Sequence, residues 1–196
     1  MTRMKAVRIH AYGGLDALTF EDAPCPEMGE DEVLIRVFAA GGVGHLAVQL
    51  AKWRGVQVIG TSKEDNLDFL RQLGVDEAID YTSTRFEEVV QDADVVLDTI
   101  GGEVLQRCWV VVKPGGMLVS LVEAPSEETA AEYGVRQALA TADADAGILN
   151  ELAALIDSGK IKPVVSTTLP LAEVRQAHTL SQSMHTRGKI VLQVAD

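Results

Sequence analysis

Residues 39–44 read Ala39-Ala40-Gly41-Gly42-Val43-Gly44, and they join a run rich in β-branched residues over 32–38 to a helical pattern over 43–53. Ala39, Gly41 and Gly44 take the three glycine positions of the dinucleotide-binding pattern G-x-G-x-x-G. A glycine at 41 would let the backbone approach a pyrophosphate, and one at 44 would let the helix pack closely on the strand. The helix N-terminus would offer its amides to the phosphates. A bare structural turn is the alternative interpretation.

Helical and strand patterns alternate downstream of this turn. Apolar residues three and four positions apart predict helices over 43–53, 66–73, 86–90, 104–111, 147–156 and 171–181. Short apolar runs predict strands over 56–59, 94–98, 117–122 and 189–194, with an edge strand over 161–165 around Pro163. Residues 127–133 fit a helical turn or a loop. Repeated β–α units predict an α/β fold, a Rossmann-like, doubly wound and mostly parallel sheet, with a small β segment formed from both termini.

The composition excludes several classes of protein. A formal net charge of −12 argues against a nucleic-acid partner, which requires a basic surface. No apolar run has the length of a membrane span, and the first residues lack the apolar core of a secretory signal. Two cysteines, Cys25 and Cys108, do not make a disulfide framework, so a reducing cytoplasmic location is expected. The four histidines lie apart from cysteines and carboxylates, and no metal site is predicted.

The residues after the 56–59 strand bear on cofactor choice. NAD-binding sites carry an acidic residue about 20 positions beyond the glycines, where it accepts from the ribose hydroxyls. This chain has Thr61, Ser62 and Lys63 there, a pair of hydroxyls and a cation that would hold a 2′-phosphate. The pattern favours NADP(H) over NAD(H). Ser62 could instead, or in addition, cap a helix whose first turn carries Glu64 and Asp65.

Two further strand ends are candidate cofactor contacts. Tyr81 follows the next expected strand and could reach the adenosine end, or could be a half-buried ring at a strand end. Asp98, Thr99 and Gly101 follow the 94–98 strand, on the side expected to face the nicotinamide; a tight structural turn is the alternative. With the glycine turn, the predicted cofactor-binding residues are Gly41, Gly42, Val43, Gly44, Thr61, Ser62, Lys63, Tyr81, Asp98, Thr99 and Gly101. No catalytic residue is identified.

Motifs along nearly the whole chain resemble one family. They are Met-Lys-Ala-Val-Arg (4–8), Tyr-Gly-Gly (12–14), Glu-Val-Leu-Ile-Arg-Val (32–37), Ala-Gly-Gly-Val-Gly-His-Leu-Ala-Val-Gln-Leu-Ala-Lys (40–52), Leu-Gly-Val-Asp-Glu-Ala-Ile-Asp-Tyr (73–81), Val-Leu-Asp-Thr-Ile-Gly-Gly (96–102), Lys-Pro-Gly-Gly-Met-Leu-Val-Ser (113–120) and Gly-Lys-Ile-Val-Leu (188–192). Together they resemble the zinc-independent medium-chain dehydrogenase/reductases, in the quinone-oxidoreductase-like, NADP-dependent branch.

The resemblance implies a large internal deletion. Most of the family's GroES-like substrate domain, and its first nucleotide-binding strand, have no counterpart between Ala40 and Gly41. The implied domains are an N-terminal remnant (1–31), a Rossmann-like dinucleotide-binding domain (32–160) and a C-terminal segment that returns to the remnant (161–196). We hypothesise that 32–38 replaces the lost strand, because an empty central position would leave backbone groups unpaired.

The resemblance also supplies the expected reaction. It implies an NADP(H)-dependent oxidoreductase that passes hydride to a quinone or enone without a metal ion, and orphaned sheet edges favour a homodimer. Two alternatives stay open. One is a non-redox enzyme, a cyclase or isomerase, on the same scaffold. The other is a nucleotide-binding module without catalysis.

Overall fold

A computed structural model describes residues 3–9, 18–24, 42–141, 145–183 and 186–194. The chain divides into two compact units, which are described separately. The first comprises Met1–His45 and Lys162–Asp196, and the second comprises Leu46–Ile161. The three-part division expected from the sequence stays a prediction. In the described part of the chain, no helix combines the length and the apolar character that crossing a bilayer requires.

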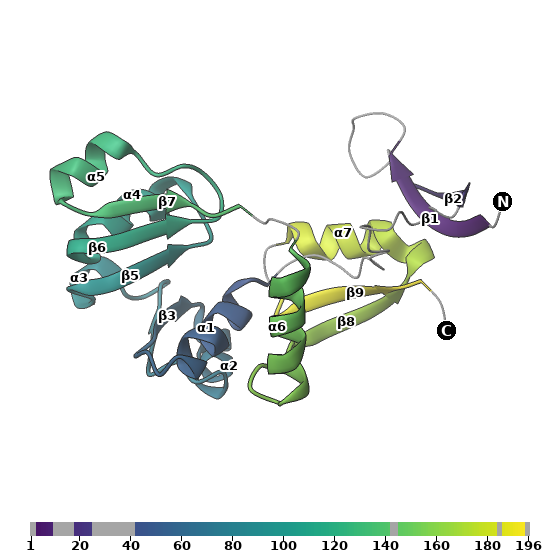
Figure 1. The fold of residues 1–196 in the computed structure, drawn as a ribbon, viewed down its shortest axis with the longest axis horizontal. Helices are drawn as coiled ribbons and strands as arrows, with labels where there is room; N and C mark the ends of the chain where they lie inside the picture. The colour runs from purple at the N-terminus through teal and green to yellow at the C-terminus, as the bar shows by residue number, and fades with distance from the viewer. Residues whose placement is uncertain (1–2, 10–17, 25–41, 142–144, 184–185, 195–196) are drawn as a thin grey trace. The chain divides into compact units, whose positions relative to one another are not determined.

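The second unit alternates strands and helices, which confirms the α/β, Rossmann-like fold. Its strands are β3 (Ile59–Ser62), β4 (Glu77–Asp80), β5 (Ala93–Asp98), β6 (Val112–Ser120) and β7 (Arg136–Leu139). Its helices are α1 (Gly44–Trp53, beginning in the first unit), α2 (Leu67–Gln72), α3 (Phe86–Val89), α4 (Gly102–Cys108), α5 (Glu127–Tyr133) and α6 (Ala146–Asp157). Strands β3 and β4 pair in parallel, and β5, β6 and β7 form a parallel sheet in that order (Figure 1).

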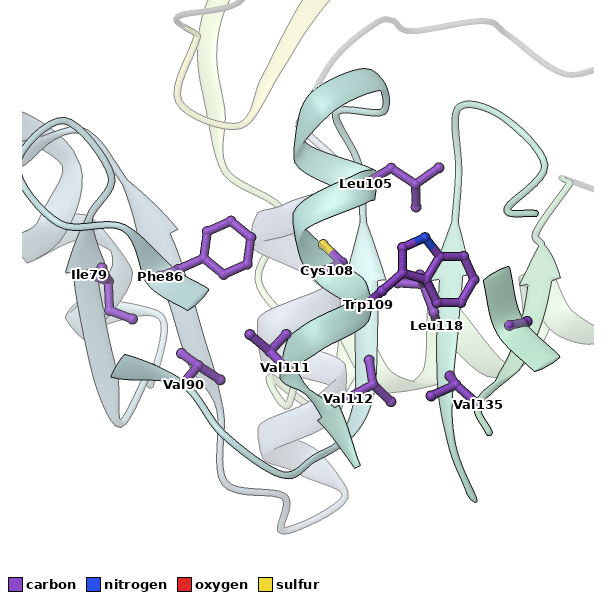
Figure 2. Close-up of a cluster of buried hydrophobic side chains, with 11 residues drawn as sticks. Ile79, Phe86, Val90, Leu105, Cys108, Trp109, Val111, Val112, Leu118 and Val135 are labelled. Carbon is purple, nitrogen blue, oxygen red and sulfur yellow. The ribbon is translucent and has the colours of Figure 1, made fainter. Parts of the chain in front are cut away.

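The core of this unit forms around α4 and the short 3₁₀ turn that follows it. Leu105, Cys108 and Trp109 are spaced three and four residues apart, so they share one face, and each is at most 4% exposed. Trp109 also stacks on Tyr133 of α5, with 6.4 Å between ring centroids. Figure 2 shows the α3 and β4 side on one flank of α4 and the β6 side on the other. The buried cluster contains Ile79, Phe86, Val90, Leu105, Cys108, Trp109, Val111, Val112, Leu118, Ala130 and Val135.

The sheet is covered unequally on its two faces. Along β5, Val96 packs against the core cluster, whereas Val95 and Leu97 point the other way and are 63% and 41% exposed. Parallel sheets are normally covered on both faces. Among the described residues, β5 has one strand neighbour, β6, and β3 has one, β4. The segment 32–38, for which we hypothesised a place in this sheet, lies outside the described residues.

The first unit contains two pairs of strands. Strands β1 (Arg3–Ile9) and β2 (Leu18–Pro24) are antiparallel, and β8 (Val165–Pro170) and β9 (Lys189–Gln193) are parallel, with α7 (Val174–Gln182) between them in the chain. Gly42 lies against the backbone of Gly188, and a Cβ on Gly42 would come within 2.4 Å of the Gly188 carbonyl oxygen. With a φ of 72°, Gly42 is suited to glycine by conformation as well as by contact.

Three strand predictions required correction. Strand β8 begins at Val165 rather than spanning 161–165, because Pro163 has no N–H and the N–H of Val164 donates to His45. Strand β3 begins at Ile59 rather than 56, since the N–H of Val56 is used by the end of α1 and that of Val58 by the Asp76 carboxylate. Strand β6 spans Val112–Ser120 rather than 117–122, because the N–H of Val122 donates to the Ser120 hydroxyl instead of a neighbouring strand. No strand was predicted over β7. The uncertain segment 127–133 is helical, with Ser126 as its N-cap and Gly134 in the left-handed conformation at its end.

A charged cluster joins α3 to α4. The Glu87 carboxylate accepts hydrogen bonds from Arg107, with Nε at 2.8 Å and a terminal nitrogen at 2.5 Å, and from Arg85 Nε at 2.9 Å. The Arg107 guanidinium lies 4.7 Å from the centroid of the Phe86 ring. The Arg107 hydrogen bonds are the main cause that lowers the pKa of Glu87 from 4.5 to about 2.

Glu87→Gln should therefore change the acid stability of this unit. A carboxyl whose pKa is lower in the folded state stabilises the fold above its unfolded pKa, and loses that effect as pH falls toward the folded value. The wild type should exceed the variant in free energy of unfolding above about pH 5, and the gap should close as pH falls toward about 2. Urea unfolding followed by tryptophan fluorescence measures this, since Trp53 and Trp109 both lie in this unit, and exposed Glu88→Gln is the control. A gap independent of pH would contradict the assignment.

In the first unit, the pH dependence of stability should come from His45. It is 5% exposed, its Nε2 accepts the Val164 N–H at 3.3 Å, and burial is the main cause that lowers its pKa below 6.5. Because the unfolded chain then binds the proton more readily, stability should fall as pH falls below about 6.5. His45→Gln should flatten this decline, and exposed His178→Gln should not. Thermal melts and Val164 amide exchange measure it, and an unchanged decline in His45→Gln would refute the assignment.

Candidate functional site

Four of the predicted cofactor residues meet at the carboxyl ends of β3 and β4. Thr61 and Ser62 are the last two residues of β3, and Lys63 follows them. The N–H of Tyr81, just beyond β4, donates to the Ser62 carbonyl at 3.0 Å, and the Tyr81 side chain is 49% exposed. The structure therefore brings the backbone of Ser62 and Tyr81 together at one edge of the strand pair, with Thr61 and Lys63 as the chain neighbours of Ser62.

The capping role considered for Ser62 is not what the structure shows. The 3₁₀ turn that starts at Glu64 has Lys63 at its N-cap position, and no side-chain hydrogen bond caps it. Glu64 and Asp65 do lie in its first turn, as expected. Ser62 is thus not committed to capping, and its hydroxyl stays a candidate ligand contact.

Asp80 is a residue that the sequence reasoning missed. Its carboxylate accepts the Thr82 N–H at 2.9 Å, the Thr82 hydroxyl at 2.7 Å and the Ser83 hydroxyl at 3.0 Å. A hydrogen bond from the backbone of Glu64 adds to these, and the Thr82 hydroxyl is the main cause that lowers the pKa of Asp80. The signal was an Asp followed within three positions by Thr and Ser, which is typical of a side-chain-stabilised turn. These bonds tie the segments beyond β3 and β4 together.

A second group lies at the carboxyl ends of β5 and β6. Asp98 is 3% exposed, and its carboxylate accepts the N–H groups of Ile100 and Gly101, both at 3.0 Å. Ser120, which is fully buried opposite Asp98 in the β5–β6 ladder, donates its hydroxyl to Asp98 at 2.8 Å. The Asp98 carboxylate is therefore occupied by hydrogen bonds within the protein. A ligand could contact only the backbone of this turn and its outward side chains.

Ser120 and Glu123 are further residues that were not singled out as part of a site. The Ser120 Oγ accepts the N–H groups of Val122 at 3.2 Å and Glu123 at 3.4 Å, so it shapes the segment after β6. The Glu123 Oε1 accepts the N–H of Gly102, the first residue of α4, at 2.5 Å. The sequence gives no sign of either contact, because the partner lies 22 positions away for Ser120 (Asp98) and 21 for Glu123 (Gly102).

The remaining predicted residues divide as follows. Gly41 lies outside the described residues. Gly42 packs against Gly188, and Val43 is 48% exposed. Gly44 begins α1, and among the described residues nothing lies within 4 Å of a Cβ built on it, so its expected packing role stays a prediction. The structure describes Gly42, Val43 and Gly44 in the first unit and the two strand-end groups in the second.

The described residues do not fit a metal site. Within these ranges, no group of three or more His, Cys, Asp or Glu side chains could hold a metal ion. Cys108 is 4% exposed, and burial is the main cause that raises the pKa of its thiol to about 12, which disfavours the thiolate that a metal requires.

Comparison with known proteins agrees with the fold. The NADPH-dependent alkenal/one oxidoreductase of Arabidopsis thaliana, a chloroplastic protein, is 34% identical over 170 residues, which cover 85% of this chain and 42% of that protein. The quinone oxidoreductase structure from Coxiella burnetii superposes with a TM-score of 0.74 at 33% identity, over 80% of this chain and 50% of that one. The Escherichia coli quinone oxidoreductase, solved with NADPH, gives 0.70 at 26% identity, over 78% and 54%.

The chain thus spans about half the length of the relatives it matches. The family model described as a zinc-binding dehydrogenase matches residues 73–192, which is more than half of the chain. The match includes the carboxyl ends of β4, β5 and β6, and it confirms the resemblance drawn from the motifs. The chain belongs to the zinc-binding dehydrogenase family.

Proposed function

We propose that this protein is an oxidoreductase that binds NADP(H) and transfers hydride to a small-molecule acceptor of the quinone or enone class, without a metal ion. Two relatives support the cofactor class: the Arabidopsis protein is named as NADPH-dependent, and the Escherichia coli quinone oxidoreductase was solved with NADPH. The described residues supply no metal-ligand set, and no step of the proposal requires zinc despite the name of the family.

The observation that carries the choice of NADP(H) is the chemistry at the end of β3. Thr61 and Lys63 stand where an NAD-type site has a carboxylate, and Tyr81 lies beside them. The nearby Asp80 carboxylate is already held by the Thr82 and Ser83 donors. Hydroxyl and ammonium groups suit a 2′-phosphate, which adds negative charge and strong acceptor oxygens.

The separate roles of the cofactor and of the protein follow from general cofactor chemistry. The nicotinamide ring, when bound, supplies the hydride, whereas the protein binds, orients and shields it from water. In this chain the two strand-end groups would hold the dinucleotide, Lys63 and its neighbours at the adenosine end and the Ile100–Gly102 turn at the other.

Lys63→Glu should weaken NADPH binding by about tenfold, because a carboxylate would replace an ammonium group next to the 2′-phosphate. NADH binding should change by less than about twofold. NADPH and NADH fluorescence titrations measure both affinities. Lys160→Glu, which makes the same charge change beside Trp53 at the end of α1, is the matched control. Equal weakening of the two cofactors by Lys63→Glu would contradict the assignment of the 2′-phosphate.

Turnover is tested by adding a small quinone or an enone to the NADPH complex and following the loss of NADPH absorbance. Binding with turnover supports the proposal, binding without turnover favours the nucleotide-binding module, and no binding refutes the cofactor assignment. The proposal includes a homodimer, since β5 has a single strand neighbour among the described residues and an open sheet edge favours association. Light scattering on the full chain tests it, and a monomer at assay concentration would refute this part.

A further inference from the structure

Glu123 bridges the two segments that leave β5 and β6. Its carboxylate holds the Gly102 N–H at 2.5 Å, and a Cβ on Gly101 would lie 3.3 Å from the Glu123 Oε1 and 3.0 Å from Val122. Gly101 and Gly102 have φ values of 79° and 57°, which suit glycine. The carboxylate therefore lies against the glycine turn, and Glu123 as a whole is exposed.

Two apolar side chains accompany this carboxylate. Asp98 and Ser120 are partners in the parallel ladder, and Ile100 and Val122 each lie two residues beyond their own member of that pair. Ile100 is 54% exposed and Val122 is 55% exposed. Because the carboxyl ends of such strands line the ligand crevice, this pair offers an apolar surface for a flat ring, beside the charge of Glu123.

We propose that Glu123 sets the preference of the site between the two redox forms of the dinucleotide, by favouring the oxidised form. This inference rests on the proposed function, which assigns the nicotinamide to this turn. The oxidised nicotinamide ring carries a positive charge and the reduced ring is neutral. A carboxylate beside the ring attracts the charged form and leaves the neutral form nearly unaffected. Because the Gly102 amide already has Glu123 as its acceptor, this turn is suited to a cationic ring rather than to a phosphate.

If Glu123 has only a structural role, the expected results differ, and two substitutions distinguish the electrostatic role from the structural one. Glu123→Gln keeps a carbonyl oxygen that can accept the Gly102 N–H but removes the charge. Glu123→Ala removes both. If the residue only held the turn, the glutamine variant would behave as the wild type, and the alanine variant would weaken both redox forms equally.

The test measures dissociation constants of NADP⁺ and NADPH for the full chain by calorimetry. Glu123→Gln should weaken NADP⁺ by about threefold to fivefold and change NADPH by less than about twofold, and the selective loss should shrink in high salt because the charge is partly exposed. Glu123→Ala should weaken both forms. Glu132→Gln, on an exposed position of α5, removes the same charge elsewhere and should change neither.

The outcomes distinguish this inference from the proposed function. If the wild type binds both forms and Glu123→Gln shifts them equally or not at all, the inference is wrong and the function stands. If the wild type binds neither form, the proposed function is wrong and the inference falls with it. Equal melting temperatures of the wild type and Glu123→Gln would establish that a selective loss comes from charge and not from unfolding.

Discussion

The buried carboxylate of Asp98 is the constraint on which the carboxyl edge of the β5–β6–β7 sheet depends. A carboxylate that is 3% exposed destabilises a fold unless donors surround it. Its donors are two backbone amides just beyond β5 and the hydroxyl of Ser120 at the end of β6. Because these donors come from two neighbouring strands, satisfying the carboxylate also fixes both turns. The positions of the turns beyond β5 and β6 therefore follow from the hydrogen bonds that the buried Asp98 carboxylate requires.

The same turn orients the helix that carries the core. Helix α4 begins at Gly102, directly after the residues that Asp98 holds, and its Leu105 and Cys108 enter the buried cluster. The helix is thus fixed at its start by hydrogen bonds and along one face by packing. The Arg107 guanidinium then connects the opposite side of α4 to Glu87 of α3. Packing and site are coupled, since loosening the Asp98 turn would also move the helix on which Trp109 depends.

Prediction from sequence worked where a segment's own side chains determine its structure. The helix over 43–53 and the strand over 94–98 were predicted from periodicity. The cofactor contacts assigned to Lys63 and Tyr81 stay predictions. Prediction failed where the partner is distant in sequence. Residues 136–139 have no strand pattern of their own and pair because β6 offers its backbone. Ser120 and Glu123 were overlooked for the same reason, since only the folded chain brings them to Asp98 and Gly102.

The carboxyl ends of the second unit differ in chemistry from one strand group to the other. At the end of β3 lie the Thr61 and Ser62 hydroxyls and the Lys63 ammonium group, followed by Glu64 and Asp65. The Asp80 carboxylate stays charged, and its acceptor oxygens are occupied by the Thr82 and Ser83 donors. Beyond β5 and β6 lie an apolar pair and the exposed carboxylate of Glu123. A ligand that suits both groups has an anionic end and a flat end that tolerates or carries positive charge. NADP⁺ has this polarity, with a 2′-phosphate on the adenosine and a cationic ring on the nicotinamide, whereas a simple polyanion would be repelled at the second group.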